Sequence, residues 1–387
     1  MKICILSPRY PWPETGGDTI RMNRLASYLK SQNHEVFLVC FFDGKEADNK
    51  KKLPYDKTIL VRRYSFISAF NSFLYIIQGR PIQCGYYQSP LFYRKFSAFI
   101  ESEKPDRYIC WLPRMSDYII KAGLCDKTIL EMSDALSKTY SLSTNSKSRG
   151  LKKIIYKIER RLIYNEEQKL IKLYPKVVLV AQPDIDYLKS EAKQNVSSLK
   201  FHTIGVDLLT NLIQNYDSNK ICFVGNMRTL QNQDAVFRFV NYIFPIIVEN
   251  IPNAQFYIVG AEPPQNIKRL ENNNIHVTGF VDNLHNFISD SCLAVAPVEI
   301  AAGIQNKVLV AMGCGIPVVM SSLISKAIPE LINGENCFIC DNPKDFAFNC
   351  INIMQSHIVR KKLSHNGYAM VDKNYSWKER LKGYEII

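Results

Sequence analysis

The sequence predicts an α/β protein made of two Rossmann-like halves that face a central cleft. The first observation is a short apolar strand at the N-terminus that leads through a diglycine loop into an amphipathic helix. The second is the return of the same strand and helix order from residue 221 onward. The third is length, because 387 residues allow two domains that each bury their own core. Strands that alternate with helices in this way form parallel sheets.

The first half opens with an apolar strand at Met1–Arg9, and the loop that follows contains Gly16 and Gly17. A helix is expected at Asp18–Lys30, because its apolar residues recur at helical spacing, and a strand follows at His34–Phe42. Further strands are expected at Arg107–Leu112, Thr128–Met132 and Lys176–Ala181.

The second half follows a linker at Ile204–Asn219 and opens with a strand at Ile221–Gly225. A helix is expected at Gln233–Glu249. The stretch Val298–Val319 then combines a small-residue loop, an amphipathic run with Lys307 in its first turn, and a Gly-x-Gly-x-Pro break.

A glycine-rich loop that enters a helix aims several backbone N–H groups at one point, and the helix dipole adds partial positive charge there. Lys307 would place a full charge beside such a phosphate cradle. The alternative is an ordinary connection whose glycines only allow tight packing. The diglycine loop of the first half favours the phosphate interpretation, because two halves then offer glycines and helix N-termini to one cleft.

The chain resembles the retaining glycosyltransferases of family 4, which have the two-domain GT-B fold, and it is similar to bacterial polysaccharide-locus transferases with a GIQNK segment. The motifs lie in order over nearly the whole chain. They are Gly16–Arg21, His34–Val36, Ile204–Asp207, Phe223–Met227, Pro252–Gly260, Val277–Val281, Gly303–Leu309 and Gly315–Val319.

The resemblance implies an N-terminal acceptor domain at 1–203, a nucleotide-sugar domain at 204–370, and a final helix at 371–387 that crosses back. It implies catalytic roles for Asp134, Glu299, Lys307 and Arg228. The donor and its phosphates are expected to contact Gly16, Gly17, Gly225, Asn226, Arg228, Gly260, Gly279, Phe280, Gly303, Ile304, Gln305, Asn306, Lys307 and Val310.

The chain departs from the family where two glutamates usually bracket the phosphate loop. Ala302 and Val310 stand at those places, and Glu299 lies three residues before the first of them. Valine cannot bind a ribose diol, so either another group holds the ribose or the donor is bound less tightly there. Lys307 is retained, and we give it more weight than any carboxylate.

The expected reaction moves a hexosyl group from a nucleotide-diphosphate sugar to a glycan or lipid-linked glycan in surface polysaccharide biosynthesis. We expect no metal and no cofactor, because protein cations neutralise the leaving diphosphate. Asp134 follows a strand and is the candidate contact to the acceptor hydroxyl. The alternative is that Asp134 caps a helix at Ala135–Tyr140.

The excess of positive over negative charge lies entirely in residues 1–200. Residues 1–200 hold 34 Lys and Arg against 20 Asp and Glu, whereas the whole chain carries +13. The densest part includes Lys152, Lys153, Arg160 and Arg161, between apolar residues at helical spacing. We expect a cytoplasmic protein that contacts the anionic inner face of the cell membrane. The alternative is a solvated helix whose apolar side is core.

Nucleic acid is not an expected partner, because no motif for it occurs and the phosphate loops lie in the near-neutral half. Eleven single cysteines in apolar runs indicate a reducing compartment. The aromatic stretch Phe66–Tyr93 either lines an acceptor groove or packs between helices.

Two other functions stay open from the residues alone. One is a two-Rossmann nucleotide-sugar epimerase or hydrolase, although the six histidines are scattered along the chain. The other is a catalytically weak donor-binding partner subunit, which the missing glutamates favour.

Overall fold

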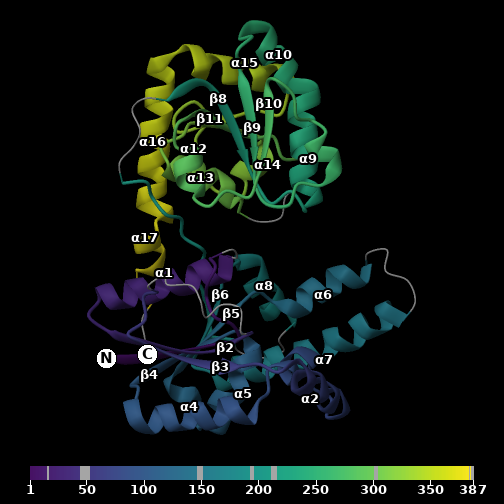
Figure 1. Cartoon of the computed structure of the whole chain (residues 1–387), viewed down its shortest axis with the longest axis vertical. Helices are drawn as coiled ribbons and strands as arrows, with labels where there is room; N and C mark the ends of the chain where they lie inside the picture. The colour runs from purple at the N-terminus through teal and green to yellow at the C-terminus, as the bar shows by residue number, and fades with distance from the viewer. Residues whose placement is uncertain are drawn as a thin grey trace. The chain divides into compact units, whose positions relative to one another are not determined.

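The computed structural model describes residues 1–14, 17–43, 53–145, 151–191, 196–210, 216–299, 304–382 and 384 (Figure 1). The chain forms two compact units, Met1–Ile204 with Leu381–Ile387, and Gly205–Arg380. Each unit contains one parallel sheet with helices, so the predicted α/β class with two Rossmann-like halves is confirmed. The domain bounds at 203 and 370 stay predictions.

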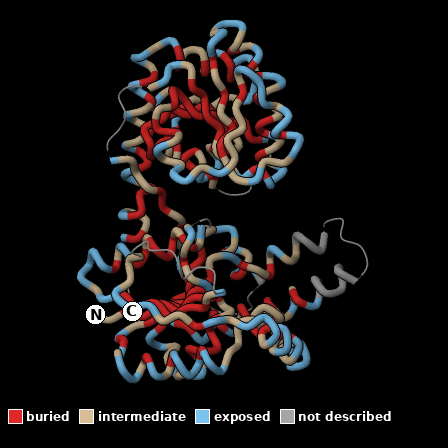
Figure 2. The backbone as a smooth tube through the Cα atoms, viewed as in Figure 1, coloured by how far each residue is buried: buried red, intermediate tan, exposed pale blue. Residues whose placement is uncertain are grey.

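The first unit is built on a seven-stranded parallel sheet in the order β3-β2-β1-β4-β5-β6-β7. The inner parts of β1 and β2, residues 3–6 and 36–42, are entirely apolar, as expected for strands that helices cover on both faces. Figure 2 shows these strands as the buried centre of the unit. The strands are β1 (Lys2–Ser7), β2 (Glu35–Phe42), β3 (Lys57–Arg62), β4 (Arg107–Trp111), β5 (Thr128–Ser133), β6 (Lys176–Leu179) and β7 (Leu199–Phe201).

The helices of the first unit follow its strands in sequence. They are α1 (Gly17–Ser31), α2 (Ser65–Ile77), α3 (Ile82–Tyr86), α4 (Pro90–Glu103), α5 (Ser116–Lys121), α6 (Leu136–Asn145), α7 (Leu151–Leu173) and α8 (Gln182–Glu191), with 3-10 turns at Pro113–Met115 and Cys125–Lys127. Lys152 and Lys153 lie in α7, but their side chains are outside the described part of the chain.

The second unit is built on a six-stranded parallel sheet in the order β10-β9-β8-β11-β12-β13. The strands are β8 (Asp217–Val224), β9 (Gln255–Val259), β10 (Ile275–Gly279), β11 (Ser291–Ala296), β12 (Val318–Met320) and β13 (Phe338–Ile339). The helices are α9 (Leu230–Arg238), α10 (Phe244–Asn250), α11 (Gln265–Lys268), α12 (Leu284–Ile288), α13 (Asn306–Gly313), α14 (Ser322–Ser325), α15 (Pro343–Gln355), α16 (His357–Tyr375) and α17 (Trp377–Leu381).

The helix predicted at Gln233–Glu249 is not continuous. A π-helical turn at Phe239–Ile243 separates α9 from α10, and Pro245 lies in the first turn of α10. Proline has no N–H and its ring displaces the preceding carbonyls, so the regular helix is interrupted there.

Both sheets reverse their direction of growth at one pair of neighbouring strands. In the first unit the chain adds β2 and β3 on one side of β1, and β4 then pairs with the other side. In the second unit the same reversal falls between β8 and β11. In open α/β sheets, ligands bind beyond the carboxyl ends of the strands at such a reversal.

The C-terminal segment returns to the first unit. The buried Tyr384 donates its hydroxyl to Oε1 of Glu131 at 2.7 Å, and Glu131 also pairs with Arg21. Arg21 and Glu131 are both almost completely buried, so the segment closes over an internal ion pair. Within the described residues, no helix is long and apolar enough to cross a membrane.

Candidate functional site

The candidate donor site lies at the carboxyl ends of β8 and β11, where the second sheet reverses. Lys307, in the first turn of α13, donates from Nζ to Oδ1 of Asn232. The Asn232 amide nitrogen in turn donates to the carbonyl of Asn226 at 2.8 Å. Asn226 follows β8 and Lys307 follows β11, so one buried amide links the two loops that flank the reversal.

Two glycines let the backbones of neighbouring loops touch at this site. A Cβ on Gly260, whose φ is +154°, would lie 1.8 Å from the carbonyl oxygen of Gly225. A Cβ on Gly225 would lie 2.7 Å from the amide nitrogen of Asn232. Both predicted glycines are therefore required by close packing, and they also keep the carboxyl ends of β8 and β9 free of side chains.

Lys307 is a partly buried cation in the first turn of α13. Among the residues that the structure describes, no carboxylate forms an ion pair with its Nζ. The nitrogen lies 4.7 Å from the centre of the Phe223 ring, which attracts a cation only modestly. Burial lowers the pKa of Lys307 to about 8. A site that holds a cation at this cost is prepared for an anion.

Arg228 lies in the same loop and is held by another acid. Its guanidinium pairs with Glu262, and both side chains are largely exposed. Glu262 has a φ of +55°, a conformation that few residues other than glycine adopt. To bind a phosphate, Arg228 must exchange this exposed partner, which costs little because such pairs are weak.

Glu299 is exposed and is paired with Arg238 at the end of α9. Arg238 also donates to the carbonyl of Asp341. This second bond holds the guanidinium that pairs with Glu299 beyond the end of β11. One oxygen of Glu299 is thus already occupied, and nothing in the sequence had indicated Arg238.

The remaining predicted donor residues are placed as follows. Gln305 is buried directly before α13, and Asn306 is the exposed first residue of that helix. Ile304 and Val310 are partly buried against the core of the second unit, so Val310 offers a ribose no polar contact. Gly303, Ala302 and Gly16 lie outside the described residues.

The end of β10 carries a second predicted pair. Gly279 has a φ of +68° and no atom within 4 Å of an added Cβ. Phe280 follows it with 64% of its surface exposed, which is unusual for a phenylalanine beside a sheet. An exposed ring at the carboxyl end of a strand suits stacking on a flat ligand.

In the first unit, Asp134 is exposed directly after β5. Desolvation raises the pKa of its carboxyl, and the charges of Asp184 and Asp18 raise it further. The interpretation of Asp134 as a helix cap is wrong. The N–H of Ala135 donates to Asp184 at 3.2 Å, and the N–H of Ser137 donates to Glu167 at 3.2 Å.

Backbone strain collects at the carboxyl ends of the two strands beside Asp134. Leu112 follows β4 with a φ of +69°, and Ser133 ends β5 with a φ of +66°. Such conformations cost about 1–3 kcal/mol each and gather at functional sites. They support a binding role for this edge of the first sheet.

A single Asp-x-Asp occurs in the chain, at Asp184 and Asp186 in α8. Lys138 pairs with Asp184 at 2.8 Å, and Gln182 donates to Asp186 at 2.8 Å. Residues two apart on a helix point away from each other, so the two carboxylates do not form one metal site.

A cavity of about 450 Å³ opens in the first unit beside α3. Tyr86, Tyr87 and Tyr140 line it together with Arg114 and Glu159. The Arg114 guanidinium lies 5.3 Å from the Tyr87 ring. Aromatic rings with a cation and a carboxylate form a surface that suits a polyhydroxylated ligand.

Gly17 gives a sharp test of the first glycine loop. It is the first residue of α1, and an added Cβ would meet only Ile204, at 3.8 Å. We expect Gly17→Val to change the free energy of unfolding by less than about 1 kcal/mol and to abolish transfer, because its side chain blocks ligand from the loop. Melting curves and initial rates measure both. A lower melting temperature with normal rates from the folded fraction would contradict the site, and Gly17→Ala, a smaller obstruction, is the graded control.

Part of the chain matches a family of known proteins. Residues 218–356 match the family model described as Glycosyl transferases group 1. The matched range begins in β8 and ends after α15, so it contains both loops joined by Asn232 and Lys307. A protein of Klebsiella pneumoniae described as an uncharacterized 44.6 kDa protein in the cps region is 21% identical over 400 residues, covering 98% of this chain and 97% of that protein.

Solved structures are similar over nearly the whole length of the chain. The TM-score is 0.67 for TarM of S. aureus in complex with UDP, at 10% identity and 99% coverage of each chain. The fold is GT-B. WaaG, a glycosyltransferase of lipopolysaccharide biosynthesis, gives 0.62 at 12% identity, covering 100% of this chain and 99% of that chain. Anabaena HepE in complex with UDP gives 0.62 at 13% identity, with coverage of 99% and 98%. The GT-B fold and the group 1 domain support glycosyl transfer.

Sequence reasoning on the GT-B motifs predicted Lys307, Gly225 and Gly260 as donor-site residues but assigned no role to the residues that hold them. Asn232, Arg238 and Glu262 belong to no motif, and their partners are 75, 61 and 34 positions away in the chain. Only the sheet topology brings these pairs together.

Proposed function

We propose that the protein is a retaining glycosyltransferase of family 4 that moves a hexosyl group from a nucleotide-diphosphate sugar to a glycan or lipid-linked glycan. The observation that carries the proposal is Lys307, a partly buried cation without a described carboxylate partner at the reversal between β8 and β11. The UDP complexes of TarM and HepE support a nucleotide diphosphate as the anion.

In the proposed reaction, the bond between the sugar and the diphosphate breaks and negative charge grows on the leaving phosphate oxygen. Lys307 and the N–H groups at the start of α13 stabilise that charge, and Arg228 turns from Glu262 toward it. These cations take the place of a metal. The leaving phosphate accepts the acceptor proton, and Asp134 orients the acceptor hydroxyl.

The acceptor is proposed to belong to a surface polysaccharide. The cps-region relative and the role of WaaG in lipopolysaccharide biosynthesis support this class. A lipid-linked acceptor places the protein at the cytoplasmic face of the membrane, where the positive charge of residues 1–200 meets anionic lipid.

Release of nucleotide diphosphate from a panel of nucleotide sugars tests the proposal. Release that requires a lipid-linked or soluble glycan, with the anomeric configuration of the donor kept in the product by NMR, supports a retaining transferase. Release or rearrangement without acceptor would instead support the hydrolase or epimerase, and donor binding without turnover the partner subunit. Full activity in a metal chelator is expected.

The pH dependence provides a separate prediction. Burial lowers the pKa of Lys307 to about 8, and only its protonated form stabilises a phosphate. We therefore expect kcat/KM for the donor to fall as the pH rises through about 8, where the free enzyme loses this proton. Lys307→Arg keeps its charge at higher pH and should remove the alkaline limb. A limb that persists in this variant would assign it to another group.

A further inference from the structure

Helix α2 has its large apolar side chains on the outside and its small polar ones on the inside. Phe66, Phe70, Phe73 and Ile77 are 73%, 62%, 59% and 67% exposed, whereas Ser68 and Ser72 are buried. The four apolar residues follow the spacing i, i+4, i+7 and i+11, which places them along one stripe of a helix. In Figure 2 this helix of the first unit is coloured largely as exposed.

Close packing explains why the serines face inward. A Cβ on Gly85 of α3 would lie 2.6 Å from the carbonyl oxygen of Asn71 and 2.9 Å from Cα of Ser72. The two helices touch backbone to backbone at Asn71 and Ser72, so only a small side chain fits at this point of contact. Tyr75 is the bulky residue that points inward, whereas Phe66, Phe70, Phe73 and Ile77 form an external stripe.

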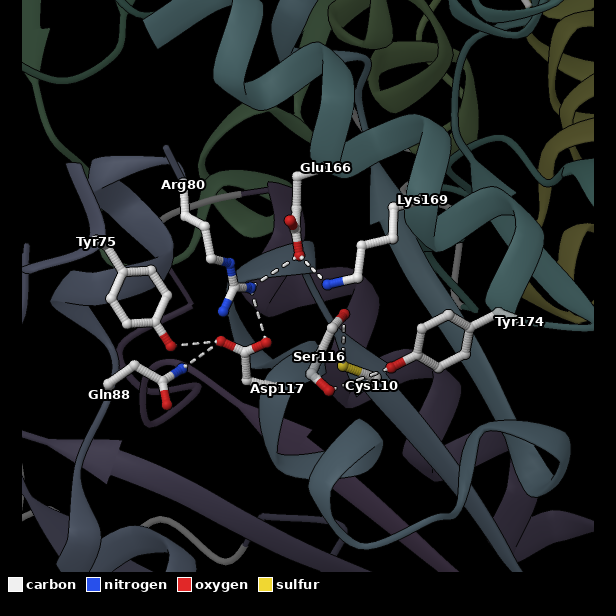
Figure 3. A network of polar contacts seen from close by, with 9 residues as sticks. All are labelled: Tyr75, Arg80, Gln88, Cys110, Ser116, Asp117, Glu166, Lys169 and Tyr174. Atoms are coloured by element: carbon white, nitrogen blue, oxygen red, sulfur yellow. Dashed lines mark hydrogen bonds and ion pairs between the residues drawn. The ribbon is translucent and has the colours of Figure 1, made fainter. Parts of the chain in front are cut away.

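Hydrogen bonds and an ion pair on the inner side of α2 fix the orientation of the helix and therefore the position of the stripe (Figure 3). The Tyr75 hydroxyl of α2 donates to Asp117 at 2.7 Å. Arg80, three residues after the end of α2, donates to Asp117 at 2.8 Å and to Glu166 of α7 at 3.0 Å. The network holds the inner face of α2 against α5 and α7.

Cations outnumber acids in the chain segment that contains the stripe, although Lys57, Arg63 and Arg80 are paired with acids from other segments (Glu103, Asp43, and Asp117 with Glu166). Residues 57–100 contain six Lys and Arg and no Asp or Glu, and α2 itself carries no charge. Arg62, the exposed last residue of β3, lies three residues before the helix, with its guanidinium 5.6 Å from the Tyr64 ring. An apolar helix face with cations at its border fits an interface between anionic headgroups and acyl chains.

We propose that α2 is the element that enters the membrane, with Phe66, Phe70, Phe73 and Ile77 inserted among the acyl chains of an anionic bilayer. The inference extends the membrane contact of the proposed function to a named helix and does not depend on the donor chemistry. It differs from the expectation that the basic residues of α7 make the contact, because there charge alone attracts the lipid.

Sedimentation with vesicles tests the inference in the absence of any substrate. Wild type should bind vesicles of equal parts phosphatidylglycerol and phosphatidylcholine, and the variant with Phe70→Ser and Phe73→Ser should bind at least about tenfold less. The matched control is Phe348→Ser with Ile358→Ser, which removes two equally exposed apolar residues from the second unit and should bind normally. Equal binding by the two double variants would overturn the inference.

Two further measurements separate the other outcomes. Brominated lipid should quench the tryptophan fluorescence of Phe70→Trp more than that of wild type. The absence of extra quenching would overturn insertion. A wild-type dimer in light scattering that only the α2 variant loses, without vesicle binding, would assign the stripe to a second copy instead. Both α2 variants should transfer sugar to a soluble acceptor at the wild-type rate, and absence of transfer by wild type would count against the proposed function alone.

Discussion

We expect Lys307→Met to reduce transfer by about 100-fold or more, which is the usual cost of removing one donor that stabilises a developing oxyanion. Methionine keeps an unbranched side chain that is one atom shorter, and it removes the charge that lies over the Phe223 ring. Initial rates at saturating donor measure the effect. The matched control is Lys326→Met, which removes an exposed lysine of the same unit and should leave the rate unchanged. Unchanged turnover by the Lys307 variant would remove this residue from the site.

Lys307→Met should not lower the stability of the fold, although it lowers activity. The pKa of Lys307 is lowered from 10.5 to about 8 by burial, so at pH 7 the folded state carries a proton that burial disfavours. Its removal relieves up to about 3 kcal/mol, against about 1–3 kcal/mol for the Asn232 oxygen left without a donor. We therefore expect unfolding at pH 7 to be no easier in the variant than in wild type.

The same linkage gives a sign for the pH dependence of stability. Between the folded pKa of about 8 and the unfolded value near 10.5, the unfolded state binds more protons than the folded state. Wild type should therefore gain stability relative to Lys307→Met as the pH rises through this range. Denaturant titrations at pH 7 and pH 10 check it, and a constant difference between the two proteins would show that Lys307 is not buried as a cation.

We expect Gly260→Ala to lower the free energy of unfolding by about 3 kcal/mol or more and to abolish transfer. The new methyl group would lie 1.8 Å from the carbonyl oxygen of Gly225, so the ends of β8 and β9 must separate. The second unit then loses its packing and the loop that carries Asn226 is displaced. Thermal unfolding and donor binding by calorimetry measure the two effects.

Gly334→Ala is the matched control for this variant. Gly334 also has a positive φ, +75°, but no atom lies within 4 Å of an added Cβ. It should therefore cost only about 1 kcal/mol of backbone strain and leave donor binding intact. Equal losses in the two variants would mean that strain, rather than contact with Gly225, makes Gly260 necessary.

The sequence located the glycines and Lys307 because their signals are local. A glycine at a strand end and a lysine in the first helical turn are visible at fixed spacing along the chain. Asn232 and Glu262 are not visible in this way, since their roles come from partners on other loops. The cap proposed for Asp134 failed for the same reason, because Glu167 and Asp184 reach that backbone from α7 and α8.

The sequence by itself determined the α/β class, the two parallel sheets and the order of strands and helices along the chain. These depend on hydrophobic periodicity and on glycines near the strand ends, which neighbouring residues alone reveal. Only the tertiary structure decided that Lys307 has no described carboxylate partner, that α9 and α10 are separate helices, and that the phenylalanines of α2 point outward. Burial and charge pairing are set by residues far apart in sequence. In α2, the tight contact of Gly85 with Asn71 and Ser72 places small residues on the inside, which is the reverse of the usual amphipathic orientation.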